Sequence, residues 1–197
     1  MQAGDFKEHI AVLELRKSET NFSWAEKRTT YAKAEQQNKA NLFSQVGIGV
    51  KSVKFTLRKQ DLSLHHALQW QGKHCFLTDI QEIDRMYVEV TAALIEPKIC
   101  TVKRTSAEEQ DSLNRPKAGK PQAAMTFPGC LIEKYMGFLQ QDPHVQTEAR
   151  FVLVTPKEVW LQLADLVEVD GVVYQVQICH TLDECKNEYE IYSREDG

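Results

Sequence analysis

Apolar and polar residues alternate along much of this chain, and alternation with a period of two residues is typical of half-buried β-strands. In residues 53–58 three apolar side chains fall on one face of the segment. Residues 88–94 and 172–179 have the same pattern. Residues 24–35 are compatible with a strand or, because they contain three alanines, with a helix. The chain is therefore predicted to be mainly β, with few short helices.

Turn signals divide the predicted strands and reveal an ordered similarity between the two halves of the chain. Asp170-Gly171 stands between two apolar runs, which is a strong signal for a β-hairpin. Gly72 marks a comparable turn 99 residues earlier, and Phe55 corresponds to Phe151 at an offset of 96. This order indicates a repeated module, although two unrelated small β domains would also share such a pattern.

The clearest boundary is a polar segment at residues 105–121, which contains two prolines, one glycine and a single large aliphatic residue, Leu113. No periodic apolar face can be drawn through this segment, so it predicts a linker or a long loop. We therefore expect two small antiparallel β-barrel or β-sandwich domains in tandem. They comprise residues 1–104 and residues 122–197, joined by the polar linker.

Charge is divided unevenly between the two predicted domains. The whole chain has a net charge of −4. Residues 1–104 contain 16 Lys and Arg against 12 Asp and Glu, whereas residues 122–197 contain 5 against 13, so the domains carry +4 and −8. Such asymmetry predicts different surroundings for the two halves, although chance variation among solvated side chains produces it as well.

A long loop precedes the Phe-x-Leu strand in each half, at residues 37–49 and 135–146. Loops of this length are usually functional or disordered, and a purely solvated loop would not need apolar residues. These residues therefore either fold back on their own domain or dock on a neighbouring subunit. The candidate assembly residues are Leu42, Phe43, Val46, Ile48, Met136, Phe138 and Leu139.

Side chains that could support chemistry form no recognisable motif. The five cysteines include no CxxC pair, and the adjacent His65 and His66 would point to opposite faces of a strand. Cys179, His180 and Asp183 are nucleophile, base and acid types, but neighbours on one extended strand rarely converge on a substrate. We therefore predict no catalytic, cofactor-binding or metal-binding residue and no enzyme activity.

Charged residues gather in two places that bear on function. Glu188 and Glu190 share one face of a predicted strand, where we expect a solvated acidic surface. In the first half, Lys54 and Arg58 lie on the strand face opposite Phe55. Because single-strand binding needs aromatic and basic side chains on one exposed surface, this arrangement argues against nucleic-acid binding as the main function.

Several segments follow one another in an order that is found in a known family of proteins. They are 22–26 (FSWAE), 52–58 (SVKFTLR), 68–80 (LQWQGKHCFLTDI) and 88–95, with a similar pattern at 165–176 and 187–189. This order resembles the small β-barrel head-closure proteins of long-tailed bacteriophages, also called head–tail adaptors or stoppers. Members with a single domain lack a second barrel after a linker, so this chain departs from them.

The resemblance implies a structural component of the phage neck, a homo-oligomeric ring between portal and tail that surrounds passing double-stranded DNA without reading its sequence. Its partners would be portal, adaptor and tail proteins, and it would need no cofactor. Glu188 and Glu190 facing the channel would repel DNA phosphates, which dominate non-specific affinity. The alternatives are a tail-completion protein of the same virion and a single-stranded nucleic-acid-binding β-barrel protein.

The expected location follows from what the sequence does not contain. No apolar run approaches the roughly 20 residues needed to cross a bilayer, and the first nine residues lack the apolar core of a secretion signal. We therefore expect a protein made in a cytosol, with no membrane partner. The resemblance implies a place in the virion neck after assembly in the bacterial host cytoplasm.

Overall fold

Twelve β-strands account for most of the described residues. The structure, a computed structural model, describes residues 6–40, 43–44, 46–104, 124–134 and 150–193. The prediction of a mainly β protein is confirmed, and the segment that was compatible with a helix lies within a strand. The few short helices expected do not occur among the described residues. The strands are β1 (Glu8–Ser18), β2 (Asn21–Ala40), β3 (Val50–Arg58), β4 (His66–Trp70), β5 (Lys73–Glu82), β6 (Tyr87–Leu94), β7 (Lys98–Lys103), β8 (Met125–Glu133), β9 (Arg150–Pro156), β10 (Leu166–Val169), β11 (Val172–His180) and β12 (Lys186–Ser193).

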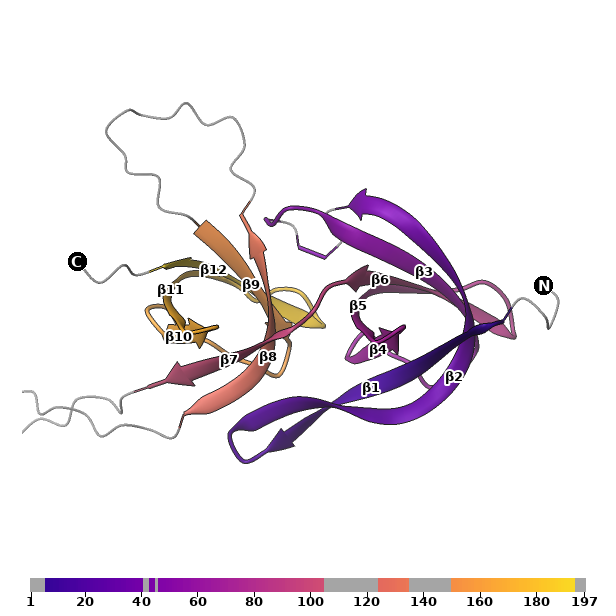
Figure 1. Ribbon diagram of the computed structural model, residues 1–197, viewed down its shortest axis with the longest axis horizontal. Coiled ribbons are helices and arrows are strands. Elements are labelled where there is room, and N and C mark those ends of the chain that lie inside the picture. Colours follow the sequence, from indigo (N-terminus) through magenta and orange to yellow (C-terminus); the bar gives the residue numbers. More distant parts are fainter. Residues whose placement is uncertain (1–5, 41–42, 45, 105–123, 135–149, 194–197) are drawn as a thin grey trace, which may run out of the picture.

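All twelve strands belong to one sheet, in the order β1-β4-β5-β6-β3-β2-β8-β7-β10-β11-β12-β9. Strand β1 also pairs with β2, and β8 also pairs with β9. Strands β1 to β6 and strands β7 to β12 therefore each form a closed cycle of six pairings, here called the first and the second strand group. Figure 1 shows the two groups side by side.

The two strand groups have the same order of pairings. Strand β1 pairs with β2 and β4 as β7 pairs with β8 and β10, and the remaining pairings match in the same way. Both groups also have a register shift at the same place, between Leu77 and Asp79 in one and between Val176 and Ile178 in the other. These positions are 99 residues apart, so the order indicated by the sequence extends to a matching β-bulge.

The observed register corrects one of the predicted correspondences. Phe55 on β3 pairs with Val90 on β6. Val90 lies one residue before the position of β6 that is opposite the bulge of β5. Tyr189 holds the same place on β12, and its partner on β9 is Leu153. Leu153, rather than Phe151, is therefore the counterpart of Phe55. A shift of two residues leaves every side chain on the same strand face, so the apolar pattern alone did not distinguish the two registers.

The predicted hairpin turns are present in both groups. Gln71 and Gly72 have φ values of 51° and 74°, and Asp170 and Gly171 have values of 52° and 81°. Positive φ at both central residues is the geometry of the two-residue turn that suits the twist of β-hairpins. Glycine adopts such values without steric cost, which explains why a glycine stands at the same position of both turns.

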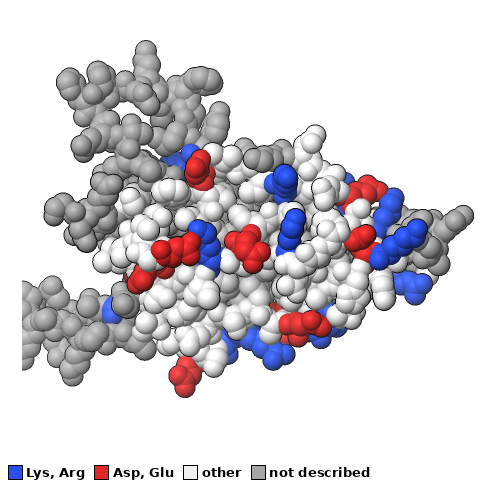
Figure 2. Space-filling model, in the orientation of Figure 1, with Lys and Arg blue, Asp and Glu red and all other residues white. Residues whose placement is uncertain are grey.

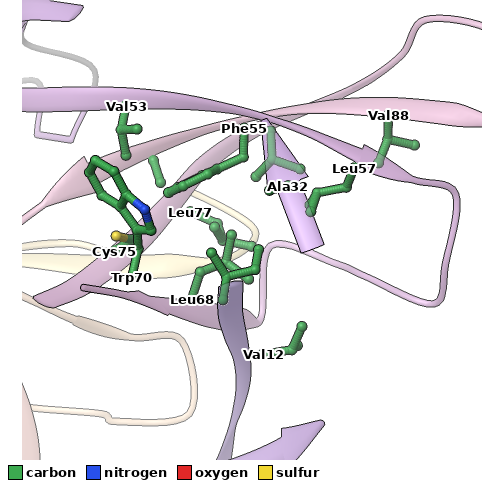
Figure 3. Close-up of a cluster of buried hydrophobic side chains, with 13 residues drawn as sticks. Val12, Ala32, Val53, Phe55, Leu57, Leu68, Trp70, Cys75, Leu77 and Val88 are labelled. Carbon is green, nitrogen blue, oxygen red and sulfur yellow. The ribbon is translucent and has the colours of Figure 1, made fainter. Parts of the chain in front are cut away.

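Each group encloses its own apolar core, because alternate side chains of its strands point inward. Figure 3 shows the first core, where the Phe55 and Trp70 rings meet edge to face at 5.7 Å. In the second core the Phe151 and Tyr174 rings meet in the same way at 5.6 Å. The second core contains Phe22, Cys100, Val102, Phe127, Leu153, Val159, Leu161, Val167, Val169, Tyr174, Val176, Tyr189 and Ile191.

The boundary between the groups differs from the predicted domain boundary. Strand β7 pairs with β8 and β10, so it belongs to the second group although residues 1–104 were assigned to the first domain. The polar segment 105–121 lies outside the described residues. It comes after β7 and before β8 in the chain, so it connects two strands of the second group and does not connect the two groups. A polar, proline-containing segment has the same composition in a hairpin connection as in an interdomain linker, so composition misplaced the boundary.

The hairpin formed by β1 and β2 joins the two groups. Asn21 on β2 pairs with Thr126 on β8, and the Thr126 amide donates to the Thr20 carbonyl at 3.3 Å. Phe22, next to this contact, is buried in the core of the second group. Figure 1 shows this hairpin extending from the first group toward β8. The two groups are therefore continuous through both the sheet and a shared core residue.

Candidate functional site

The largest apolar contact outside the two cores lies between the two strand groups. The first group contributes Phe76 and Ala93, and the second contributes Cys130, Ile132, Val152 and Val154. Phe43, which lies between β2 and β3, packs against this contact, and its ring meets that of Phe76 edge to face at 5.1 Å. We call this set the intergroup contact, because it joins outward faces of both strand groups.

The structure shows where three of the candidate assembly residues lie. Phe43 is only 1% exposed, so it folds back on its own chain. Val46 packs against the intergroup contact and is partly buried, whereas Ile48 is 42% exposed. Of the two alternatives for the first loop, folding back is therefore the one that Phe43 follows. The remaining candidates, Leu42, Met136, Phe138 and Leu139, lie outside the described residues.

Glu188 does not lie on a solvated acidic surface, and that prediction is wrong. The residue is 5% exposed, and its carboxylate has two side-chain partners. Lys186 Nζ donates to Oε1 at 2.7 Å, and Ser44 Oγ donates to Oε2 at 2.7 Å. The strand alternation places Glu188 outward from the second core as expected, but the segment at Phe43 and Ser44 covers that outward face.

Glu190 is also buried, at 4% exposed, and is held by two bases. Lys134 Nζ donates to Oε2, and His180 Nε2 lies 3.1 Å from Oε1. Burial acts to raise the pKa of Glu190, but the hydrogen bonds from Lys134 and His180 and their charges outweigh it, so the pKa lies below its ordinary value. Glu190 is therefore a buried, ion-paired residue of the second strand group, and the prediction of a solvated acidic surface is wrong for it as well.

Lys186 connects the buried carboxylate of Glu188 with the apolar intergroup contact at Phe43. Its side chain is nearly buried, and Nζ donates to the Phe43 carbonyl as well as to Glu188. The same Nζ lies 5.9 Å from the centroid of the Phe43 ring, within the range of a cation–π interaction. Because Glu188 and Lys186 both bind the segment at Phe43 and Ser44, which lies between β2 and β3, this ion pair fastens that segment to β12.

Two histidines of the first strand group have partners of different kinds. His65 Nδ1 lies 3.3 Å from Glu158 Oε1, and this pair links the first group to the loop after β9. His74 is 6% exposed, its ring lies 5.4 Å from that of Trp24, and burial lowers its pKa to about 4. Within the described residues, no group of three or more His, Cys, Asp or Glu side chains is placed to hold a metal ion.

Separate partners surround the three residues that the sequence offers as nucleophile, base and acid. Cys179 Sγ lies 3.9 Å from the Leu161 carbonyl, and burial raises the pKa of its thiol. His180 pairs with Glu190. Asp183 Oδ1 accepts hydrogen bonds from the amides of Cys185 and Lys186 at 2.8 and 3.1 Å, as a turn-capping aspartate does. The structure does not bring these side chains into one constellation.

Asp84 in the first group caps its turn in the same way as Asp183 in the second. Its Oδ1 accepts hydrogen bonds from the amides of Met86 and Tyr87 at 2.7 and 2.9 Å. Asp84 and Asp183 are 99 residues apart, as are the two β-bulges. The equivalent turns therefore share their side-chain chemistry as well as their strand pairings.

Equivalent faces of the two groups differ in polarity. The register that matches Phe55 with Leu153 matches Cys130, Ile132, Val152 and Val154 with Lys33, Glu35, Lys54 and Thr56. Lys33 forms an ion pair with Glu35 at 2.6 Å, and Lys54 forms one with Glu89 at 2.7 Å. The face is therefore apolar in the group where it is covered and charged in the group where it is exposed, as the hydrophobic effect requires.

Comparisons with protein-family models, with curated proteins and with solved structures found no match. The described residues contain no helix that could span a membrane. The partners of the two acidic residues, Ser44, Lys134 and Lys186, are not among the residues that the sequence singles out. Lys186 precedes Glu188 and Glu190 at a spacing of two, so the three side chains share one strand face. That spacing was the one available signal that the acidic face contains its own counter-ion.

Proposed function

We propose that the protein is a structural component of the bacteriophage neck, a head–tail connector or head-closure ring between portal and tail. The observation that carries the proposal is the repeated order of strand pairings, which includes the segments on which the resemblance to head-closure proteins rests. In both groups the Gly-containing turn and the closing strand occupy the same positions. The proposal assigns the chain to assembly and assigns it no reaction.

In this proposal the two strand groups are two small β-barrel domains in tandem. Each closed cycle of six pairings surrounds a separate apolar core, which is how a barrel differs from an open sheet. Among the described strands, closure leaves neither group with an unpaired edge strand to which a neighbour could add a strand. Loops and outward faces would then carry the contacts between subunits, and the candidate residues Met136, Phe138 and Leu139 stay part of the proposal.

The intergroup contact supports the proposal of a rigid, two-domain building block. Phe22 of β2 packs in the apolar core of the second group, Phe43 packs in a cluster that both groups form, and Ser44 donates a hydrogen bond to Glu188 at the same boundary. A ring subunit must keep its shape while it transmits contacts on two sides. Such a unit should have few flexible connections, and two buried contacts lie across the boundary between the two strand groups.

Because Glu188 and Glu190 are buried, other acidic residues of the second group would have to repel DNA. The exposed carboxylates of the second group include Glu168, Asp170 and Glu184. We propose that these side chains, in place of the buried pair, limit sticking of DNA phosphates near the channel. On the face shown in Figure 2, acidic and basic side chains are interspersed, so that face has no continuous patch of either sign.

The test is binding to purified portal particles encoded by the same phage genome as this chain. The full chain is mixed with these particles, separated by sedimentation and viewed by negative-stain microscopy, with portal particles of an unrelated phage as the control. A ring of this protein on the cognate portal alone supports the proposal. Absence of the protein from the cognate portal fraction, together with the absence of rings, overturns it. Binding to isolated tail ends in place of the portal assigns the tail-completion alternative.

A further inference from the structure

Four outward side chains form a row across four neighbouring strands at one end of the first group. Tyr87 on β6 pairs with Arg58 on β3, and His9 on β1 pairs with Tyr31 on β2. The pairing of Ala32 with Leu57 brings Tyr31 beside Arg58. Their inward neighbours Leu57 and Val88 are buried in the first core, which fixes the row on the outer surface. With the adjacent ring of Phe6, we call this set the aromatic row.

The rings of the aromatic row contact one another and leave one of them largely exposed. Phe6 stacks on Tyr87 at 5.3 Å with 13° between the ring planes, and His9 meets Tyr31 at 5.4 Å. Tyr31 is nevertheless 60% exposed. A hollow of about 470 Å³ adjoins it and is lined by Phe6, Thr29, Thr30, Tyr31 and Arg58. An exposed tyrosine beside such a hollow offers a ring face to a ligand.

Arg58 supplies a positive charge at the centre of the row. Its side chain is exposed, and among the described residues no carboxylate forms an ion pair with it. The next residue, Lys59, forms an ion pair with Glu82 on β5 at 2.7 Å, so the carboxylate of Glu82 already has a cation as its partner. A planar guanidinium between aromatic rings binds phosphate and also stacks on bases.

We propose that the aromatic row binds single-stranded nucleic acid. Bases would stack on Tyr31 and on the Phe6–Tyr87 pair, while Arg58 between them would contact the phosphate of the connecting backbone. The two platforms lie two strands apart, about 10 Å. Aromatic platforms with interspersed cations on one exposed sheet surface are the usual arrangement for such ligands. The inference stands independently of the neck assignment, since it concerns another surface and another ligand.

The arrangement of the aromatic row also bears on the expectation that Arg58 has no aromatic side chain on its own face. Arg58 does lie on the face opposite Phe55, as the alternation predicts. The aromatic partners come instead from neighbouring strands, with Tyr31 on β2 and Tyr87 on β6. Sequence distance hid this surface, because Tyr31, Arg58 and Tyr87 meet only through strand pairing.

The test measures fluorescence anisotropy of a labelled oligothymidylate of about 15 nucleotides, a length within the usual site sizes, titrated with the full chain. The variants are Tyr31→Ala and Arg58→Ala. Arg16→Ala is the matched control, since it removes an exposed arginine of β1 that lies seven residues, about 23 Å, from His9. We expect each of the first two variants to weaken binding about 10-fold and the control to change it less than about 2-fold. Arg58→Ala should also reduce the dependence of binding on salt.

Three results would overturn the proposal. One is the absence of oligothymidylate binding at about 50 mM salt, where phosphate contacts are strong. Another is binding that both variants leave unchanged. The third is loss of binding to cognate portal particles by Tyr31→Ala while oligothymidylate binding stays the same, which would assign the row to protein contacts. Portal binding by Arg58→Ala at the level of the unmodified chain keeps the neck proposal separate from this one.

Discussion

Ser44 and Glu188 are 144 residues apart in the chain, and Ser44 Oγ donates a 2.7 Å hydrogen bond to Glu188 Oε2 in a buried site. This bond connects the loop after β2 with the outward face of β12. The sequence leaves open whether this loop folds back on its own domain or docks on a neighbouring subunit, and it predicts a solvated surface for the glutamate. Their contact shows that both belong to one internal boundary, with Lys186 as the shared cation.

Replacing Glu188 by alanine should lower the free energy of unfolding by about 3 kcal/mol. The change leaves the nearly buried Lys186 ammonium without its carboxylate, and breaking one side of a buried pair is costly. Urea unfolding followed by tryptophan fluorescence measures the effect. Glu168→Ala, at an exposed position of β10, is the control and should change stability by less than about 0.5 kcal/mol. Equal effects of the two variants would contradict this prediction.

Replacing Phe43 by alanine should destabilise the protein by about 3 kcal/mol, because it removes a buried ring from a packed contact. Since Phe43 packs within its own chain, the urea midpoint should not depend on protein concentration. Ile48→Ala, which truncates a half-exposed side chain of the same loop, should cost less than about 1 kcal/mol. If Phe43 docked on a neighbouring subunit instead, the Phe43→Ala variant and the unmodified chain would have the same urea midpoint at low protein concentration and different midpoints at high concentration. That result would contradict the prediction.

Gly129 on β8 should not tolerate alanine, although its counterpart in the first group is Ala32. A Cβ at Gly129 would lie 2.8 Å from Cys100 Sγ and 2.8 Å from Leu153 Cδ1. Overpacking of this kind costs about 1–3 kcal/mol. Removing the sulfur should relieve part of the clash, so the double variant Gly129→Ala/Cys100→Ala should be more stable than the sum of the single effects predicts. Simple additivity in urea unfolding would refute the proposed clash.

Stability should fall between pH 6.5 and pH 4 because of His74. Burial lowers its pKa to about 4 in the folded chain, whereas the unfolded group has an ordinary value near 6.5. The unfolded state therefore binds a proton in this window that the folded state does not, and stability decreases as the pH falls through it. The difference corresponds to about 3 kcal/mol at the lower end. His74→Phe should flatten urea midpoints measured at pH 7.5, 5.5 and 4.5.

The variant His65→Phe is the control for the pH series, since His65 is about half exposed and pairs with Glu158 at the surface. Between pH 6.5 and pH 5 its urea midpoints are compared with those of His74→Phe. Below that range the lowered pKa of Glu190 adds a second loss, because protonation of this carboxylate removes its bonds to Lys134 and His180. A His74→Phe variant with the full slope of the unmodified chain would show that another group sets the pH dependence.

The sequence by itself determined the strand class, the two glycine turns and the order of the repeated elements. Alternation along residues 53–58 and 172–179 specifies which side chains face a core, since successive side chains point to opposite faces. Gly72 and Gly171 specify turns, because positive φ favours glycine. These are local properties of the backbone, and the structure has them where the pattern predicts them.

Only the tertiary structure decided what lies on the outward faces. Alternation places Glu188 away from its own core but says nothing about Ser44, which covers it from another part of the chain. Pairing across strands also chose Leu153 as the counterpart of Phe55, assigned β7 to the second group, and brought Tyr31 beside Arg58. Each of these depends on contacts between distant segments, and a period of two residues specifies a face without specifying its neighbour.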